Sequence, residues 1–157
     1  MNQLVTYEIG EQIYSGPNTW IYRASRRDTG QPVVLKVLNQ VHPLAAKIAQ
    51  FKLEYEIISA LDLPGVVRAY DLGVEQGHWM MVLEDFGGEA LTTLLPAAPL
   101  LLGEFLALAI PLVDTIGQLH AQRVIHKDIN PANIVLNQHT GQLKLIDFGL
   151  ASRLSQE

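Results

Sequence analysis

Strand-forming apolar and aromatic residues recur between Tyr7 and about Val41, and turn-forming residues break this region at two places. The first break is Ser15-Gly16-Pro17-Asn18 and the second is Asp28-Thr29-Gly30-Gln31. Glycine, proline, asparagine and aspartate are the residues that tight turns favour, each for its own backbone reason. The pattern therefore predicts three antiparallel strands in this region.

A helix is predicted directly after these strands. The helical pattern of apolar positions begins at Pro43, runs to about Leu61 and stops at Leu63-Pro64-Gly65. Two further strands are expected at 67–72 and 78–83, with a hairpin turn at Glu75-Gln76-Gly77 between them. These elements together predict a small lobe of five strands and one helix, and a cofactor is expected in a cleft between this lobe and the next.

The longest apolar run is Leu94–Val113, whose only charged residue is Glu104. A run of this length could cross a bilayer. Three prolines and Gly103 interrupt it, so we expect no membrane span in this chain. The pattern favours a buried turn followed by a core helix from about Gly103 to Gln122.

Composition narrows the classes of protein that this chain can belong to. Hydrophobic residues make up 48% of the sequence, which supports a packed core and excludes a disordered chain. The net charge of −5 argues against a nucleic-acid binder. The absence of cysteine excludes disulfides and thiolate metal sites, and it is compatible with the expected cytoplasmic location.

Lys36 lies in the run Val33–Leu38, which is apolar on both faces of the predicted strand. An ammonium group in such a place requires a partner, because burying an unpaired charge costs free energy. On the following helix Glu54 falls about 60° from Phe51 on the apolar face, whereas Glu56 falls about 140° away from it. Glu54 is therefore the predicted partner of Lys36.

Three polar residues in the last thirty positions have a spacing that suits Mg²⁺-ATP chemistry. The runs 134–136 and 143–146 are strand-like and close enough in sequence to form a hairpin, which would place Asn133 beside Asp147. Carboxylate and amide oxygens are ligands that Mg²⁺ accepts, and Asp128 is a candidate general base.

These residues stand in two segments, 124–136 and 145–149, that resemble the catalytic loop and the metal-binding motif of protein kinases. Nearly the whole chain resembles the first half of a Hanks-type serine/threonine protein kinase domain. The sequences of residues 84–89 and 126–131 are similar to those in the kinase domains of cyanobacterial multi-sensor serine/threonine and histidine hybrid kinases.

The resemblance implies a fold of the α+β class, like that of a protein kinase. Residues 1–83 would form the amino-terminal lobe, a five-stranded antiparallel sheet with one helix. Residues 84–89 would form the hinge. Residues 90–157 would form an incomplete, helical carboxy-terminal lobe that carries the catalytic loop.

The resemblance also implies ATP and Mg²⁺ as cofactors and phosphoryl transfer to a protein hydroxyl. Lys36 and Glu54 would orient phosphates, Asp128 would accept the hydroxyl proton, and Asn133 and Asp147 would hold Mg²⁺. Further nucleotide contacts would come from the phosphate loop, the adenine-binding residues, the gatekeeper and the hinge backbone: Gly16; Ile21, Val34 and Val135; Leu83; Glu84 and Phe86. A buried hydrophobic column would consist of Ile58, His126 and Phe148.

The sequence departs from the kinase pattern at three places. The loop Tyr14–Thr19 keeps only Gly16 of the three usual glycines, and Pro17 in it has no N–H to offer a phosphate. Asn130 stands where serine/threonine kinases usually have a lysine, and Lys127 replaces the arginine before the catalytic aspartate. A pseudokinase or nucleotide-binding interaction module is therefore the alternative function.

A small-molecule phosphotransferase is the third possibility, and Lys127 with Asp147-Phe148-Gly149 argues against it. Because the chain ends ten residues after Asp147, we expect a fragment of a larger kinase that is inactive alone. Its expected partners are a protein substrate and, in a full-length protein, sensor, ATPase or histidine kinase domains. No nucleic acid is expected among them.

Overall fold

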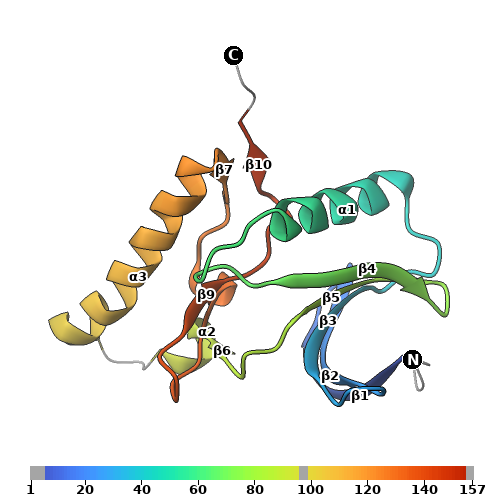
Figure 1. The fold of residues 1–157 in the computed structure, drawn as a ribbon, viewed down its shortest axis with the longest axis horizontal. Helices are drawn as coiled ribbons and strands as arrows, with labels where there is room; N and C mark the ends of the chain where they lie inside the picture. The colour runs from blue at the N-terminus through green and yellow to red at the C-terminus, as the bar shows by residue number, and fades with distance from the viewer. Residues whose placement is uncertain (1–5, 96–98, 155–157) are drawn as a thin grey trace. The chain divides into compact units, whose positions relative to one another are not determined.

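Antiparallel strands form the five-stranded sheet that the sequence predicts (Figure 1). The computed structural model of the protein describes residues 6–95 and 99–154. The strands follow the order β1-β2-β3-β5-β4 across the sheet. They are β1 (Tyr7–Ser15), β2 (Thr19–Arg26), β3 (Pro32–Leu38), β4 (Ala69–Glu75) and β5 (His78–Glu84).

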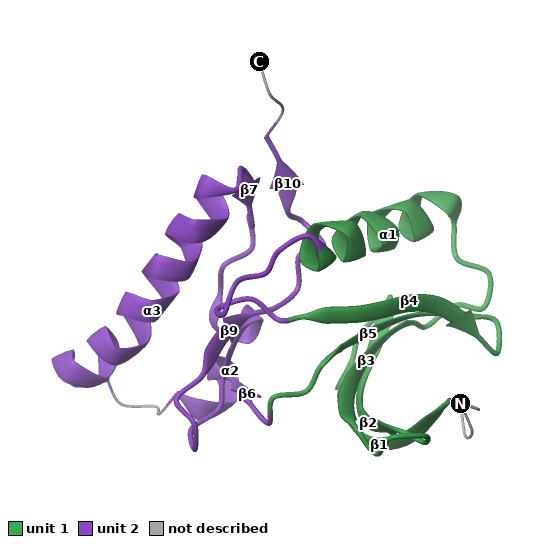
Figure 2. Ribbon diagram, viewed as in Figure 1, with its two compact units in different colours: residues 1–59, 68–86 green, residues 60–67, 87–157 purple. Residues whose placement is uncertain are grey.

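The described residues divide into two compact units (Figure 2). Unit 1 comprises residues of the ranges 1–59 and 68–86, and it contains the whole five-stranded sheet. Unit 2 comprises residues of the ranges 60–67 and 87–157.

One face of the sheet in unit 1 carries an apolar core. Successive side chains of a strand point to opposite faces, and residues paired across strands share a face. Leu35 pairs with Tyr22 and Val82, and all three lie on the core face. The buried members of this cluster are Tyr7, Ala24, Val33, Leu35, Val37, Met80 and Val82.

The helix of unit 1, α1 (Ala45–Ser59), packs against β4. The predicted helix from Pro43 to about Leu61 is confirmed, with the ends two residues shorter. The strand predicted at 67–72 instead begins at Ala69 and continues to Glu75. The hairpin turn after it consists of Gln76 and Gly77 at φ values of 51° and 81°, the left-handed region that suits the twist of a two-residue hairpin.

Unit 2 is built from short elements and one long helix. Its two small sheets have the orders β6-β8-β9 and β10-β7. The elements are β6 (Glu89–Ala90), α2 (Leu91–Leu94), α3 (Leu102–Ala121), β7 (Val124–Ile125), the 3₁₀ turn η1 (Pro131–Asn133), β8 (Ile134–Leu136), β9 (Leu143–Leu145) and β10 (Ser152–Arg153).

A close approach at Gly65 joins two parts of unit 2. The Leu145 N–H donates to the Gly65 carbonyl at 2.8 Å, and the Val67 N–H donates to the Leu145 carbonyl at 3.1 Å. A β-carbon at Gly65 would lie 1.9 Å from Oγ1 of Thr115 on α3. Glycine is therefore required here by the lack of space beside α3.

The expectation that 103–122 forms a core helix is wrong in one respect. The helix exists as α3, but only Thr115 and Leu119 of it are buried. Pro111, one of the residues expected to interrupt the apolar run, lies inside the helix. Residues 96–98 of the predicted buried turn lie outside the described residues.

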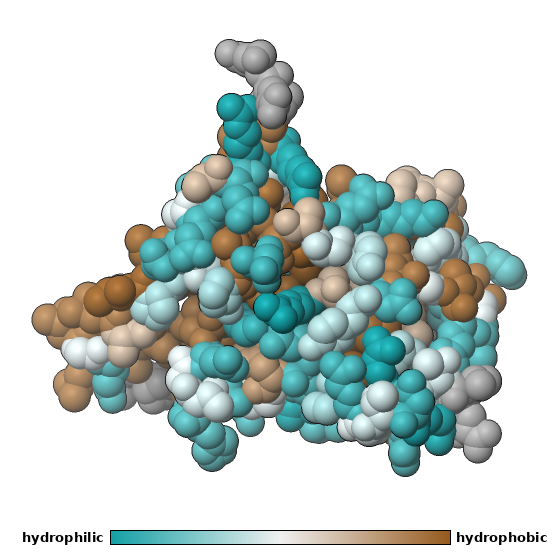
Figure 3. Space-filling model, in the orientation of Figure 1, coloured by the Kyte–Doolittle hydropathy of each residue, from teal (hydrophilic) through white to brown (hydrophobic). Residues whose placement is uncertain are grey.

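Composition alone did not predict the burial of this helix, because α3 is apolar on more than one face, while only one face contacts β7 and β9. Apolar residues gather on the surface over its first turns (Figure 3). Among the described residues α3 is the one helix long and apolar enough to span a membrane by length and composition, which is weak evidence of such a role. Exposed apolar side chains at its start and along it are Leu101, Leu102, Phe105, Leu106, Ile110 and Val113.

We expect residues 1–157 alone to self-associate through this exposed face of α3. The side chains of Ile110 and Val113 are 64% and 66% exposed, and apolar patches of this kind drive association in water. The double substitution Ile110→Lys with Val113→Lys should raise the monomer fraction in sedimentation velocity runs at increasing concentration.

The matched control is Leu119→Lys, on the buried face of the same helix, where the side chain is 1% exposed. It should destabilise unit 2 instead of improving solubility, because the added ammonium would be buried. A wild-type chain that stays monomeric at every soluble concentration would contradict the prediction.

Candidate active site

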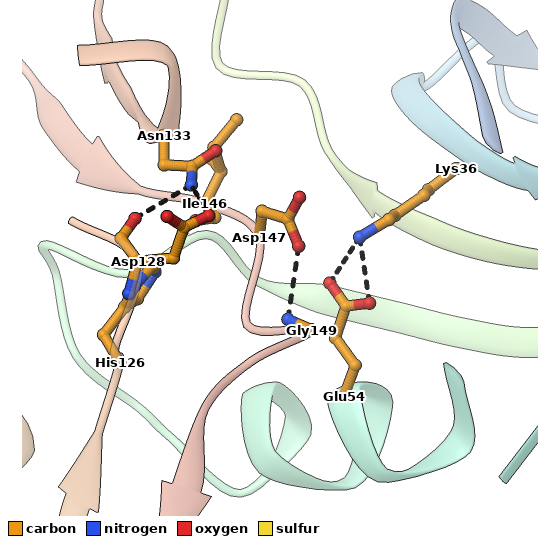
Figure 4. A network of polar contacts seen from close by, with 8 residues as sticks. All are labelled: Lys36, Glu54, His126, Asp128, Asn133, Ile146, Asp147 and Gly149. Carbon is orange, nitrogen blue, oxygen red and sulfur yellow. Dashed lines mark hydrogen bonds and ion pairs between the residues drawn. The ribbon is translucent and has the colours of Figure 1, made fainter. Parts of the chain in front are cut away.

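Lys36 of β3 and Glu54 of α1 form a buried ion pair within unit 1 (Figure 4). The Lys36 Nζ donates to both carboxylate oxygens of Glu54, at 2.7 Å to Oε1 and 2.9 Å to Oε2. The side chains are 8% and 4% exposed. A pair this dry persists only with good geometry, and two short contacts to one carboxylate provide it. The predicted pairing is confirmed.

The helical period explains why Glu54 and not Glu56 meets the lysine. Glu54 shares the buried face of α1 with Phe51, Ile57 and Ile58. Glu56 is exposed, as the sequence predicts. The rotation of α1 about its axis therefore brings a carboxylate to the sheet together with the apolar side chains that hold the helix there.

The predicted nucleotide-binding residues of unit 1 lie on the face of the sheet that carries Lys36. Ile21 pairs with Lys36 across β2 and β3, and Val34 pairs with Leu83 across β3 and β5. Val34 and Lys36 are two residues apart on one strand and so point to the same face. The sheet thus brings all four side chains together on the face opposite the apolar core.

The end of β5 is fixed by backbone and side-chain contacts. The Glu84 N–H donates to the Arg68 carbonyl at 2.9 Å, and the Arg68 N–H donates to Oε2 of Glu84 at 3.2 Å. Asp85 pairs with Arg23 of β2 at 3.5 Å. Phe86 is the last residue of unit 1. These contacts therefore fix the positions of Glu84 and Asp85, the first two residues of the predicted hinge.

Gly16 lies in the turn between β1 and β2, where its N–H donates to the Thr19 carbonyl at 2.9 Å. A β-carbon at Gly16 would lie 2.5 Å from the hydroxyl of Tyr14, so the ring of that tyrosine lies close to the glycine. Asn39, which sequence analysis did not single out, holds the same turn. No motif marks it, because it follows the apolar strand β3 as an ordinary polar residue.

In unit 2 the carboxylate of Asp128 is held by two amide groups. The Asn133 Nδ2 donates at 2.9 Å to Oδ2 and at 2.9 Å to the carbonyl of Asp128 (Figure 4). The Asn130 Nδ2 donates to Oδ1 at 3.1 Å and to the same carbonyl at 3.2 Å. Each carboxylate oxygen therefore accepts from a different amide. The contact of Asn130 was not predicted.

The Asn130 amide is held in this orientation because its oxygen also takes part in a hydrogen bond. Its Oδ1 accepts from the Ala132 N–H at 2.9 Å and so caps the 3₁₀ turn η1. Pro131 occupies the first position of that turn, where a missing N–H costs nothing. The local sequence Asn130-Pro131 therefore fixes both the turn and the side chain beside Asp128.

His126 links the loop that carries Asp128 to the backbone that precedes Asp147. The Asp128 N–H donates to Nδ1 of His126 at 3.3 Å, which leaves Nε2 as the protonated nitrogen that donates to the Ile146 carbonyl at 3.0 Å. The ring stands edge-on to Phe148, with centroids 4.6 Å apart. Two members of the predicted hydrophobic column are thus in contact, and the stacking of Ile58 of unit 1 on them stays a prediction.

The hairpin of β8 and β9 brings Asn133 and Asp147 together as predicted. Ile134 pairs with Leu145, and the Ile146 N–H donates to the Asn133 carbonyl at 3.0 Å. Asp147 has a φ of 59°, a left-handed conformation uncommon for a residue with a side chain. Its Oδ1 accepts from the Gly149 N–H at 3.2 Å, which is a local turn that stabilises this conformation.

The donor set of Asn133 and Asp147 fits Mg²⁺ that arrives with a nucleotide. Because the Asn133 Nδ2 faces Asp128, its Oδ1 points the other way and is the atom that could face a cation. One carboxylate and one amide oxygen are few ligands, but Mg²⁺ usually completes its shell with phosphates and water. In the described ranges no group of three His, Cys, Asp or Glu residues could hold a metal.

Comparison with known proteins relates the chain to one family. The protein kinase domain matches residues 7–157. The serine/threonine-protein kinase pkn2 of Myxococcus xanthus is 32% identical over 87% of this chain and 17% of its own length. The serine/threonine-protein kinase PrkC of Bacillus subtilis is 32% identical over 95% of this chain and 23% of its own length.

A plant relative gives the same result. The CBL-interacting protein kinase 33 of Oryza sativa is 32% identical over 96% of this chain and 33% of its own length. The chain therefore spans between about a sixth and a third of the length of these relatives. The narrower similarity to cyanobacterial hybrid kinases stays a prediction.

The ion pair yields a prediction about stability. Lys36→Met alone should lower the free energy of unfolding of unit 1 by about 3–5 kcal/mol, because it leaves the Glu54 carboxylate buried without its ammonium. The double substitution Lys36→Met with Glu54→Leu should recover most of that loss, since no charge then remains to be buried. Denaturant unfolding followed by tryptophan fluorescence measures this, because both tryptophans, Trp20 and Trp79, belong to unit 1.

The matched control is Glu56→Gln, two residues along the same helix and exposed. It should change the unfolding free energy by less than about 0.5 kcal/mol. A double variant no more stable than Lys36→Met would contradict the role assigned to the pair.

Proposed function

Since this chain belongs to the protein kinase family, we propose that it forms the ATP-binding and catalytic part of a serine/threonine protein kinase. The observation that carries the proposal is the placement of Asp128. Amide donors hold both of its carboxylate oxygens at 2.9 Å and 3.1 Å in a partly buried turn, so neutral groups orient this base. A carboxylate held in this way can accept the proton of a substrate hydroxyl while oxygen attacks the terminal phosphorus of ATP.

Residues of unit 1 orient the nucleotide in this proposal. The Lys36 ammonium binds the α- and β-phosphates, and Glu54 keeps that ammonium in place through its two contacts. Ile21, Val34 and Leu83 present apolar surface to the adenine ring. Because the Glu84 N–H already donates to Arg68, the Glu84 carbonyl is the hinge group that meets adenine, together with the backbone of Phe86.

Residues of unit 2 complete the chemistry. Val135 on β8 adds apolar surface for adenine. In unit 1, Gly16 allows the backbone near it to approach phosphate. Asn133 and Asp147 hold Mg²⁺, which neutralises negative charge on the phosphates when bound. The left-handed backbone of Asp147 aims its carboxylate, and the Gly149 N–H orients it.

The proposed organisation is that of the kinase family. Residues 1–83 form the amino-terminal lobe, 84–89 the hinge, and 90–157 the part of the carboxy-terminal lobe that contains the catalytic residues. A protein substrate carries the accepting serine or threonine. The proposal includes a larger protein with further sensor, ATPase or histidine kinase domains and a cytoplasmic location.

A pseudokinase or nucleotide-binding interaction module is the alternative, and one contact favours it. The family usually has a lysine at the position of Asn130, where its charge would meet the transferred phosphoryl group. The Asn130 amide here faces Asp128 instead, at 3.1 Å. The neutral amide supplies no charge to the phosphoryl group, so binding without transfer is the outcome that this alternative predicts.

Metal binding can be tested without catalysis. Asp147→Asn should abolish most of the Mg²⁺-dependent increase in affinity for a non-hydrolysable ATP analogue, measured by calorimetry on residues 1–157. The fold should remain, because asparagine tolerates the left-handed conformation and its Oδ1 can still accept from the Gly149 N–H. Asp114→Asn, on the exposed side of α3, is the matched control and should leave the increase unchanged. An unaltered Mg²⁺ dependence in Asp147→Asn would refute the assignment.

Phosphate transfer should be measured with two proteins, the longest natural protein that contains this sequence and residues 1–157 alone. Asp128→Ala should lower phosphate transfer to a generic protein acceptor by about 10²–10⁴-fold, because it removes the general base while leaving nucleotide binding. Asp114→Ala is again the control. Transfer that survives Asp128→Ala would exclude the proposed base, and analogue binding without transfer in the longest wild-type protein would favour the alternative function.

A further inference from the structure

The turn between β1 and β2 is held by one residue that lies outside it. Asn39, which follows β3, donates from its Nδ2 to the carbonyl of Gly16 at 3.2 Å and to the carbonyl of Pro17 at 2.8 Å. Its backbone N–H donates to the carbonyl of Asn18 at 3.0 Å. Three consecutive carbonyl groups of the turn therefore accept hydrogen bonds from a single residue.

The orientation of the Asn39 amide follows from its surroundings. Both groups that face it are carbonyl oxygens, so the atom directed at them must be the nitrogen. Its Oδ1 is buried and finds no hydrogen-bond partner in the part of the chain that the structure describes. A buried acceptor left without a partner costs free energy of folding. The side chain therefore keeps its hydrogen bonds to the turn although its own oxygen is unsatisfied.

Of residues 16–18 at the tip of the turn, only one has an N–H to offer a ligand, and these bonds fix its direction. The Gly16 N–H is used by the Thr19 carbonyl, and Pro17 has none. The remaining N–H is that of Asn18. It belongs to the same trans peptide unit as the Pro17 carbonyl and points the opposite way, so a bond that fixes one fixes the other.

A second contact ties the turn to the helix that carries Glu54. The Lys47 Nζ of α1 contacts Oδ1 of Asn18. Lys47 precedes Glu54 by seven residues, which is about two turns, so both project from nearly the same side of the helix. Asn39 follows Lys36 by three residues. The turn is therefore linked to both strand and helix that hold the ion pair.

We propose that Asn39 is a positioning residue for nucleotide phosphates, acting through the backbone of Gly16, Pro17 and Asn18. The inference rests on the proposed function, in which this turn covers the phosphates of ATP. Only one glycine is present in the turn, and its shape is imposed from β3 by hydrogen bonds to its carbonyls. The Asn18 N–H is thereby held ready for a phosphate oxygen, and Asn39 itself touches no part of the nucleotide.

The test compares two ligands that differ only in their phosphates. Calorimetry on residues 1–157 should measure the dissociation constants of a non-hydrolysable ATP analogue with Mg²⁺ and of adenosine. Asn39→Ala should raise the constant for the analogue about fivefold or more, the scale expected for the loss of a hydrogen bond or two, and change that for adenosine less than about twofold.

Two further variants separate the hydrogen bonds from the shape of the side chain. Asn39→Asp keeps the shape but loses both N–H donors, so it should weaken analogue binding at least as much as Asn39→Ala. Gln40→Ala, at the exposed neighbouring position, should leave both constants unchanged. Amide hydrogen exchange at Asn18 should become faster in the two Asn39 variants and stay unchanged in Gln40→Ala.

Each outcome decides between the inference and the function on which it rests. Equal analogue affinity in the wild-type chain and in both Asn39 variants would overturn the positioning role and leave the proposed function standing. An equal loss of affinity for adenosine and for the analogue would also overturn it, because it would show a general effect on folding. Failure of the wild-type chain to bind either ligand would overturn the proposed function itself.

Discussion

The buried ion pair of Lys36 and Glu54 is the interaction on which the arrangement of unit 1 depends. An ammonium on the face of a central strand is tolerated only if a carboxylate reaches it, and that requirement selects the rotation of α1. The same rotation buries Phe51, Ile57 and Ile58, so apolar packing and charge pairing demand one position of the helix. Agreement of this kind between independent forces is what makes a fold unique, because no other rotation satisfies both.

Unit 2 holds its candidate site residues by a different means. Its side chains are placed by short local turns, with asparagine amides, a histidine ring and left-handed backbone conformations at 127 and 147, whereas unit 1 relies on a sheet and a helix. Local hydrogen bonds orient Asp128, but each contributes only about 1 kcal/mol. Several must therefore act together, and the hairpin of β8 and β9 supplies the frame that keeps them in register.

The sequence predicted those features that follow from period and spacing. The strands, α1, the pairing of Lys36 with Glu54 and the meeting of Asn133 with Asp147 all depend on which side chains share a face, and face follows from counting residues. Two features escaped. The failure of α3 to form the expected core helix depends on what packs against an apolar helix, which composition does not reveal. The bonds of Asn39 and Asn130 depend on loop geometry, and a single asparagine in a sequence carries no sign of the carbonyl or carboxylate that it will meet.

The left-handed backbone at Asp147 also restricts how this site can change over generations. At a φ of 59° most side chains are strained, and glycine, asparagine and aspartate are the residues accepted with least cost. Aspartate and asparagine codons differ by a single base. A lineage can therefore lose the charge at this position in one mutational step that changes the fold little, whereas most other replacements would add backbone strain. Loss of this charge, and with it of the proposed catalysis, while the structure is retained is the evolutionary path that this conformation leaves open.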